Sequence, residues 1–332
     1  MEALELNALS QSPAARPVPG LERALAVVVD ECLAVRPGES VLVVADPASV
    51  QLAEAMRAQA ERAGADAVLA FMAERPSHGA EPPPPVAAAL AAADAFLAPT
   101  AKSLSHTQAR HQATQAGVRG ATLPGVTPEV LARTMAVDFA TLRERSRAVA
   151  ALLDEAEQAH LTCPRGSDLR LDLAGRNGIP DDGDLSAPGA FGNLPCGEGF
   201  IAPAGGAGTF VASSVAAVGL ATDQPARLTV DDGHLTEATG GAGQRLLSLL
   251  RHHGDAGTNL AELGVGTNDR ATLTGNVLED EKVLGTVHVA FGASAAIGGT
   301  VSVPVHLDCV VLDASLTVDG TPLLEEGRLL VP

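Results

Sequence analysis

The stretch SVLVVADPASVQLAEAMRAQAERAGADAVLAFM, residues 40–72, decides the fold class of this chain. Residues 40–45 form an apolar run typical of a buried strand. Residues 50–63 have the pattern of a helix that ends near Gly64, and residues 65–72 form the next apolar run. Strands that alternate with helices favour a parallel sheet. We therefore predict a Rossmann-like α/β layer in the first half of the chain.

The same alternation continues to about residue 137. No G-x-G-x-x-G motif follows the first strand, so we expect no dinucleotide site in this layer. The further elements predicted here are strands over 95–98 and 118–123, helices over 86–93, 105–116 and from Thr127 onward, and a long helix over about 138–158.

Beyond His160 the sequence changes to short β-type runs separated by glycines. One helix, about 243–252, interrupts them. We predict an α/β domain over residues 1–158, followed by a β-rich catalytic domain over 159–332 that binds metal. The predicted strands of the second domain are 169–173, 208–216, 226–230, 287–291 and 301–312.

Composition excludes several classes of partner. The chain has 332 residues and is 46% hydrophobic, so it can bury a large core. Its net charge of −18, with 22 Lys and Arg, argues against binding to nucleic acid. It has no apolar stretch long enough to span a bilayer, and its acidic start is unlike a signal peptide. We expect a cytoplasmic protein with no membrane partner.

Five side chains in the second half are candidate metal ligands. His306 and Asp308 are two residues apart in a β-type run, so both would point to one face of a strand. His288 lies in a similar run, and Glu198 and Glu262 lie in glycine-containing segments. Two imidazoles and three carboxylates suit zinc, cobalt or iron(II) better than calcium or magnesium.

Several motifs around these residues resemble one known family. In order and rough spacing they are similar to those of the leucyl aminopeptidases of the aminopeptidase T family, and the resemblance covers nearly the whole chain. The motifs are Ser103-Leu104-Ser105-His106-Thr107-x-Ala109-Arg110, Asn193-Leu194-Pro195-x-Gly197-Glu198, Glu262-Leu263-Gly264-x-Gly266-Thr267-Asn268, the run 279–288, and His306-x-Asp308.

The resemblance implies a metal-dependent aminopeptidase. It assigns metal-ligand positions to Glu198, Glu262, His288, His306 and Asp308, and it makes Glu198 the candidate general base. In such a site the ions polarise the scissile carbonyl and activate a water. The implied substrate is a small peptide or amide with a free amino terminus, the implied metal is zinc or cobalt, and the implied assembly is a homodimer.

The chain also departs from the peptidase pattern. Ala295 stands where the peptidases carry a tyrosine, and the chain contains no tyrosine. Two alternatives therefore stay open. The first is a dioxygenase: the fold resembles that of the 2,5-dihydroxypyridine dioxygenases, and Glu262, His306 and Asp308 of this chain would then hold one iron(II). The second is a repurposed metalloenzyme or scaffold of the same fold. Because the dioxygenase group favours a histidine at the position of Glu262, the aminopeptidase is the first prediction.

Other polar residues have simpler interpretations. Glu281 is predicted to be a buried partner of Lys282 within an otherwise solvated charge run. His252 is expected to cap a helix end. His106 and His111 are expected to lie on one helix and to have structural or domain-interface roles. The four cysteines show no C-x-x-C spacing, and most of them are expected to be small core residues; they are Cys32, Cys163, Cys196 and Cys309.

Overall fold

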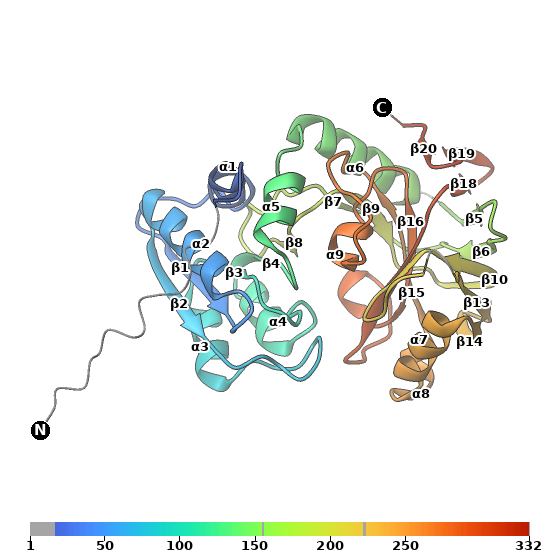
Figure 1. Cartoon of the computed structure of the whole chain (residues 1–332), viewed down its shortest axis with the longest axis horizontal. Helices are drawn as coiled ribbons and strands as arrows, with labels where there is room; N and C mark the ends of the chain where they lie inside the picture. The colour runs from blue at the N-terminus through green and yellow to red at the C-terminus, as the bar shows by residue number, and fades with distance from the viewer. Residues whose placement is uncertain (1–16, 155, 222–223, 332) are drawn as a thin grey trace, which may run out of the picture.

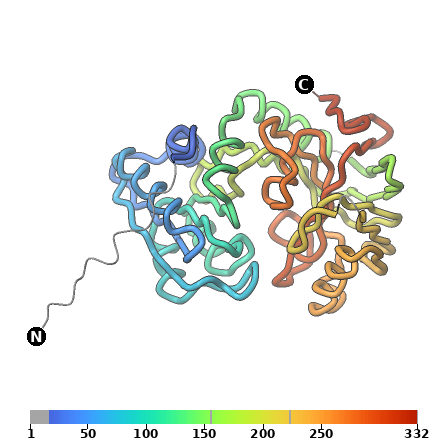
Figure 2. The backbone as a smooth tube through the Cα atoms, in the orientation of Figure 1, coloured from blue at the N-terminus to red at the C-terminus, as the bar shows by residue number. Residues whose placement is uncertain are grey.

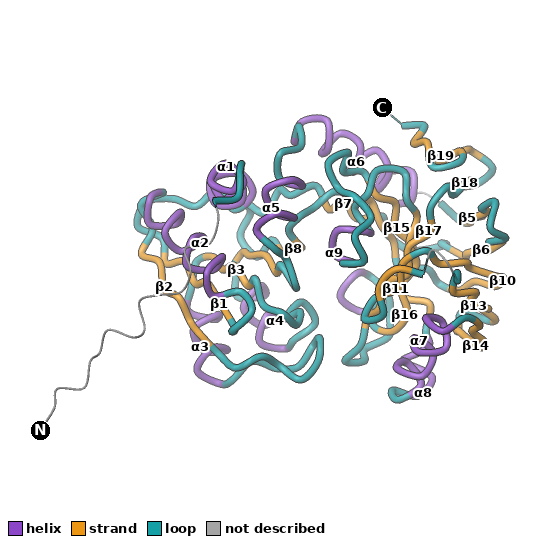
Figure 3. The backbone as a smooth tube through the Cα atoms, viewed as in Figure 1, coloured by secondary structure: helices purple, strands orange, loops and turns teal. Residues whose placement is uncertain are grey.

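The computed structural model describes residues 17–331 except 155, 222 and 223. In this part of the chain the strands form three sheets with helices packed around them (Figures 1 and 3). The helices are α1 (Leu21–Ala26), the π-helix η1 (Val27–Cys32), α2 (Val50–Arg62), α3 (Pro84–Ala92), α4 (Gln108–Gln115), α5 (Pro128–Thr134), α6 (Phe139–Asp154), α7 (Gly241–Arg251), α8 (Gly254–Thr258), α9 (Val277–Asp280) and the 3-10 helix η2 (Ala295–Ile297).

The first sheet, here called the parallel sheet, has the order β2-β1-β3-β4-β8, and all its pairings are parallel. Alternate residues of β1 enter different cores: Val41 and Val43 pack with α1, α2 and α5, whereas Leu42 and Val44 pack with α3 and α4. The sheet is therefore covered on both faces, as the apolar run predicts. Its strands are β1 (Ser40–Ala45), β2 (Asp66–Phe71), β3 (Ala95–Ala98), β4 (Arg119–Thr122) and β8 (Phe191–Asn193).

The eight-stranded sheet is antiparallel and has the order β14-β13-β10-β6-β5-β18-β19-β20. Its inner face shares one hydrophobic core with the seven-stranded sheet described next. Its strands are β5 (Gln158–Thr162), β6 (Asp168–Asp172), β10 (Gly205–Ala212), β13 (Ala226–Asp231), β14 (His234–Thr239), β18 (Ser315–Val318), β19 (Thr321–Glu325) and β20 (Arg328–Leu329).

The seven-stranded sheet, order β12-β11-β17-β16-β15-β9-β7, is also antiparallel. It carries all five predicted ligands. Helix α6 packs across β9 and β7. The strands are β7 (Ile179–Asp181), β9 (Glu198–Ile201), β11 (Ser214–Val215), β12 (Gly219–Leu220), β15 (Leu260–Gly266), β16 (Val287–Gly292) and β17 (His306–Val311).

These sheets confirm the predicted fold class, an α/β layer followed by a β-rich part. The division at residue 158 stays a prediction, and β8, from beyond that residue, joins the parallel sheet by pairing with β4. Figures 1 and 2 show the N-terminal part, in blue and cyan, on one side and the orange and red C-terminal strands on the other. No helix within the described residues is both long and apolar enough to cross a membrane.

Three predicted boundaries were wrong for local reasons. The helix expected over 105–116 begins at Gln108, because the Thr107 hydroxyl accepts a hydrogen bond from the Arg110 backbone N–H and caps the helix there. The strand expected over 301–312 begins at His306, after Pro304, which cannot donate to a strand ladder. The long helix ends at Asp154, four residues earlier than predicted.

Candidate active site

Strand register places the five predicted ligands on one face of the seven-stranded sheet. Glu262 of β15 and Asp308 of β17 both lie opposite Ala290, on the strand between them. His288 is two residues from Ala290, so its side chain points to the same face. His306 is two residues from Asp308, and Glu198 pairs with Gly266, four residues from Glu262. The opposite face, which includes Leu263, Val289 and Cys309, belongs to the hydrophobic core.

A glycine makes room for one of the imidazoles. Gly264 lies opposite His288 in the strand register. A Cβ atom on Gly264 would lie 2.1 Å from Nε2 of His288, far inside any normal contact. The Glu262-Leu263-Gly264 sequence thus combines a carboxylate with the space that the neighbouring ring needs.

The outer group of ligand atoms consists of Glu262, His306 and Asp308. Nε2 of His306 lies 3.1 Å from a Glu262 carboxylate oxygen and 3.5 Å from an Asp308 oxygen. Its other nitrogen, Nδ1, lies 2.7 Å from the backbone carbonyl oxygen of Ala293. A carbonyl only accepts hydrogen bonds, so Nδ1 carries the proton and donates it. Nε2 therefore faces the two carboxylates, and it would present its lone pair to a metal ion bound between them, which is the usual orientation of a metal-binding histidine.

The inner group consists of Glu198, Glu262 and His288, so the two groups share Glu262. Nε2 of His288 lies 3.3 Å from a Glu198 oxygen and 3.4 Å from a Glu262 oxygen. All three residues are buried. In contrast to His306, Nδ1 of His288 is buried with no hydrogen-bond partner among the described residues. The inner group therefore lacks the carbonyl contact that orients the outer imidazole.

A buried lysine lies behind the inner group. Lys282 is 0% exposed, and its ammonium forms ion pairs with Glu198, with Glu281 at 2.9 Å and with Asp181 at 3.3 Å. Burial alone would lower the pKa of Lys282, but the three carboxylates outweigh it and hold that pKa well above its ordinary value. The ammonium is therefore a fixed positive charge, and the predicted pairing of Glu281 with Lys282 is confirmed.

The remaining charge at the site is negative. The buried carboxylates there are Asp181, Glu198, Glu262, Glu281 and Asp308. They face Lys282 and two imidazoles: although burial acts to lower the pKa of each ring, the carboxylates raise that of His288 to about 9 and that of His306 well above its ordinary value. Burial raises the pKa of Asp181 to about 7 and raises that of Glu281 well above its usual range. Burial also acts to raise the pKa of Glu262, but hydrogen bonds from His288 and His306 outweigh it, and the pKa is lowered. Buried anions need a compensating cation, so this donor set fits a divalent metal ion.

The outer group opens into a cavity of about 210 Å³. Its second wall comes from β8 and from Ser105, His106 and Arg110 of the first half, at the carboxyl edge of the parallel sheet, where ligands commonly bind in α/β folds. The Thr122 hydroxyl donates to Oδ1 of Asn193 at 2.7 Å, and the Ser105 hydroxyl lies 2.6 Å from that of Thr122. The sequence-based prediction placed the site in the second half alone, whereas the structure adds this wall from the first half.

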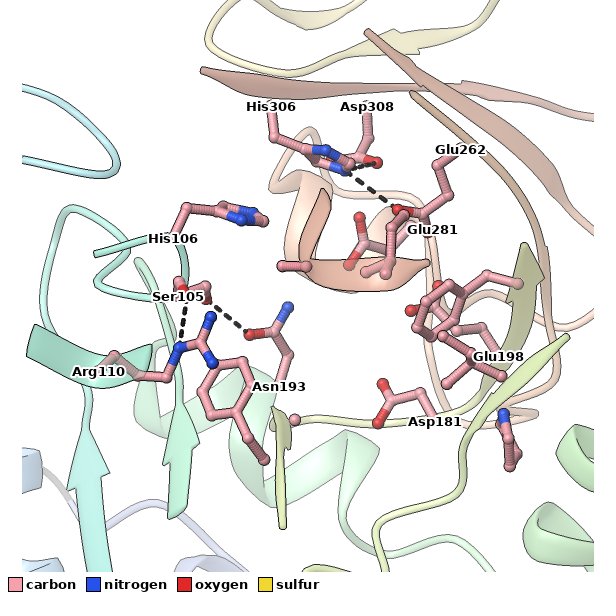
Figure 4. A pocket seen from close by; sticks show the side chains of 17 residues that line it. Ser105, His106, Arg110, Asp181, Asn193, Glu198, Glu262, Glu281, His306 and Asp308 are labelled. Atoms are coloured by element: carbon pink, nitrogen blue, oxygen red, sulfur yellow. Dashed lines mark hydrogen bonds and ion pairs between the residues drawn. The ribbon is translucent and has the colours of Figure 1, made fainter. Parts of the chain in front are cut away.

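Two residues that line the cavity were not predicted to have a role there. The rings of His106 and His306 stack with centroids 5.2 Å apart, and His106 lies before α4, which begins at Gln108. Burial lowers the pKa of His106 to about 3, which keeps its ring uncharged. Arg110 lines the same cavity. Figure 4 shows both on the side of the pocket opposite Glu198. Their presence in the Ser103 to Arg110 motif was the available signal.

Other sequence interpretations concern residues away from the ligand atoms. Nδ1 of His252 donates to the Ser248 carbonyl at the end of α7, which confirms a capping role. Cys196 and Cys309 are buried, and burial raises the pKa of each thiol well above its ordinary value. They are neutral core groups. The Gly205 to Gly208 segment is part of β10.

Comparison with known proteins reveals relatives of both predicted kinds. The structure of 2,5-dihydroxypyridine dioxygenase from Pseudomonas putida KT2440 has a TM-score of 0.82 at 21% identity, covering 95% of this chain and 99% of that chain. Wild-type AmpT from Thermus thermophilus has a TM-score of 0.69 at 21% identity, and the match covers 94% of this chain and 99% of that chain. A search of curated proteins found no match. At these identities the similarity shows a shared fold.

The chain therefore has the enzyme fold that these two proteins share. More narrowly, a family model described as 2,5-dihydroxypyridine 5,6-dioxygenase matches residues 23–331, and the chain belongs to this family. The family match favours the second interpretation of the sequence over the first. The aminopeptidase T resemblance is retained as a relationship of fold.

Proposed function

We propose that the protein is a mononuclear non-haem iron(II) dioxygenase that opens the ring of a dihydroxylated, pyridine-type substrate. The family match supplies the reaction class. One observation in the site carries the metal assignment: His306 donates Nδ1–H to Ala293 and presents Nε2 to Glu262 and Asp308. These three residues would hold the ion on one side and leave its other side facing the cavity.

Bound iron(II) would supply the redox chemistry that a reaction with dioxygen requires. The protein's own residues bind and orient the ring. His106, uncharged, can accept a hydrogen bond from a ring hydroxyl, and the Asn193 amide, held by Thr122, offers a second polar contact. Phe191 and Phe200 add apolar walls. A second cavity of about 130 Å³ also borders His306 and Asp308, so the outer group faces space on two sides.

The inner group is the specific observation that favours the other candidate, a two-metal hydrolase. Three features support one ion instead. Lys282 already compensates Glu198 with its positive charge. His288 lacks a partner at Nδ1 among the described residues. Ala295, in η2, replaces the tyrosine that the peptidases carry. We therefore propose that Glu198 balances the positive charge of Lys282 and is not the general base.

A direct test compares the two reactions on one preparation. The protein is reconstituted anaerobically with iron(II), or separately with zinc or cobalt, and offered 2,5-dihydroxypyridine or an aminoacyl amide. The proposal expects oxygen uptake with the iron protein and the pyridine, in step with loss of substrate. Cleavage of the amide by the zinc or cobalt protein, with no oxygen uptake by the iron protein, would return the assignment to the hydrolase.

A further inference from the structure

Arg110 of α4 and Arg119 of β4 are both buried beside the parallel sheet, but their charges are compensated differently. Arg110 and Arg119 are both 7% exposed. Arg119 forms an ion pair with Glu39 and donates to the carbonyls of Leu33 and Ala34, so its charge is compensated. Arg110 forms no ion pair with any Asp or Glu of the described residues, and burial lowers its pKa to about 10.

The contacts that Arg110 does make fix its position and leave donors free. Nε donates to the Ser105 carbonyl at 2.6 Å, and one terminal nitrogen, Nη1, donates to the Thr114 hydroxyl at 3.4 Å. The guanidinium carbon lies 4.2 Å from the centre of the Phe191 ring, so the group is stacked on an aromatic face. A guanidinium has five N–H donors in a fixed fork. These contacts use two of the five donors, Nε–H and one N–H of Nη1, so the second N–H of Nη1 and both N–H groups of Nη2 are left for a ligand.

The position of the Arg110 guanidinium in the cavity indicates that it contacts the ligand. Among the described residues that line the cavity, Arg110 is the one Arg or Lys, and the same cavity is lined by Glu262, His306 and Asp308. Figure 4 shows Arg110 beside Ser105 and Asn193, across the pocket from the outer group. Burying a cation without a partner is costly, and a bidentate carboxylate is the partner that a guanidinium fits best.

We propose that Arg110 recognises a carboxylate on the substrate, so that the preferred substrate is a single dihydroxylated N-heteroaromatic ring that bears a carboxylate. This inference rests on the proposed function and deepens it. The carboxylate meets the Arg110 fork at one end of the cavity, and the hydroxylated edge of the ring faces the outer group at the other. In a pocket with so many acidic side chains, an anionic substrate needs this local positive charge.

Binding to a matched pair of unreactive probes tests the inference without turnover. The probes are 6-hydroxypyridine-3-carboxylate and its uncarboxylated parent, 2-hydroxypyridine, added anaerobically to the iron-loaded protein. Because the chain has no Trp and no Tyr, near-ultraviolet difference spectra report the ligand with little protein background. We expect wild type to bind the carboxylated probe about ten to a hundred times more tightly, the gain of charge-assisted hydrogen bonds.

Two variants and one control separate recognition from folding. In Arg110→Gln the advantage of the carboxylated probe should disappear, whereas Arg110→Lys should keep part of it because the charge remains. Arg119→Gln removes a buried arginine outside the cavity, so it should lower stability and leave the ratio of the two affinities unchanged. Thermal unfolding of each variant identifies any that is not folded.

The possible results distinguish failure of the carboxylate assignment from failure of the dioxygenase proposal. A wild-type protein that binds both probes equally, or an Arg110→Gln protein that weakens both by the same factor, would overturn the carboxylate assignment. If the ratio depends on Arg110 but neither 2,5-dihydroxypyridine nor a carboxylated dihydroxypyridine drives oxygen uptake, the recognition stands and the dioxygenase proposal fails. If both hold, kcat/KM for the carboxylated substrate should fall about tenfold or more in Arg110→Gln, with less change for the uncarboxylated one.

Discussion

Nδ1 of His306 lies 2.7 Å from the carbonyl oxygen of Ala293, and this one hydrogen bond orients the ring so that Nε2 faces Glu262. The carbonyl belongs to the segment that leads from β16 towards η2, so the orientation is set by a neighbouring strand end and not by the acidic residues themselves. The imidazole is therefore preorganised as a ligand by the fold.

Glu262 is the ligand that departs from the two-histidine, one-carboxylate arrangement of iron oxygenases. We expect Glu262→Ala to lose iron, because the outer group then keeps two donors. Glu262→His should retain close to one iron per chain, because it restores three donors in the usual ratio. Iron content after desalting measures both, with Glu237→Ala, an exposed acid of β14, as the control. Equal iron in wild type and Glu262→Ala would remove Glu262 from the site.

Lys282 is expected to be essential to the stability of the site. Lys282→Met leaves Asp181, Glu198 and Glu281 buried without their cation, and breaking a buried ion pair from one side typically costs about 3–5 kcal/mol. Urea unfolding measures the loss. Lys102→Met, which removes a partly exposed lysine 3.9 Å from Glu74, should change the free energy of unfolding by less than about 0.5 kcal/mol. Similar values for the two variants would mean that Lys282 does not compensate these carboxylates.

Gly264 is expected to tolerate no side chain. Gly264→Ala would place a methyl group 2.1 Å from Nε2 of His288, and relieving such an overlap in a packed interior costs about 1–3 kcal/mol. Gly241→Ala, at the start of α7, is the matched control: a Cβ there has nothing within 4 Å, and alanine stabilises by about 0.4–1 kcal/mol because it restricts the unfolded chain. Thermal unfolding should move in opposite directions for the two. A stable Gly264→Ala protein would show that the ring of His288 can lie elsewhere.

Local sequence patterns predicted most of the regular structure, because alternation and capping are properties of short segments. Strand β1 and helix α2 follow directly from residues 40–62. Glu262 was harder to place: Gly264 and Gly266 lower the apparent strand propensity of β15, and the strand exists because β9 and β16 pair with it on both sides. That support comes from tertiary structure.

In the candidate site, too, some residues could be placed from local sequence and others only from the tertiary fold. His306 and Asp308 share a face because they are two residues apart on one strand, which any sequence shows. Arg110 and His106 reach the cavity only because the parallel sheet and the seven-stranded sheet meet there, joined by the short segment between Asn193 and Glu198. The pattern of a short polar helix does not predict that meeting, and membership of the Ser103 to Arg110 motif was the one available signal. Knowledge of the fold was needed to find it.

Iron binding by His306 and dioxygenase activity are tested together by measuring iron content and oxygen uptake on three proteins. Wild type, His306→Ala and the control His253→Ala, an exposed histidine after α7, are loaded anaerobically with iron(II), desalted and given 2,5-dihydroxypyridine and its carboxylated derivative in an oxygen electrode. The account predicts about one iron per chain and substrate-dependent oxygen uptake in wild type and His253→Ala, and loss of both in His306→Ala. Full iron content and unchanged oxygen uptake in His306→Ala would contradict it.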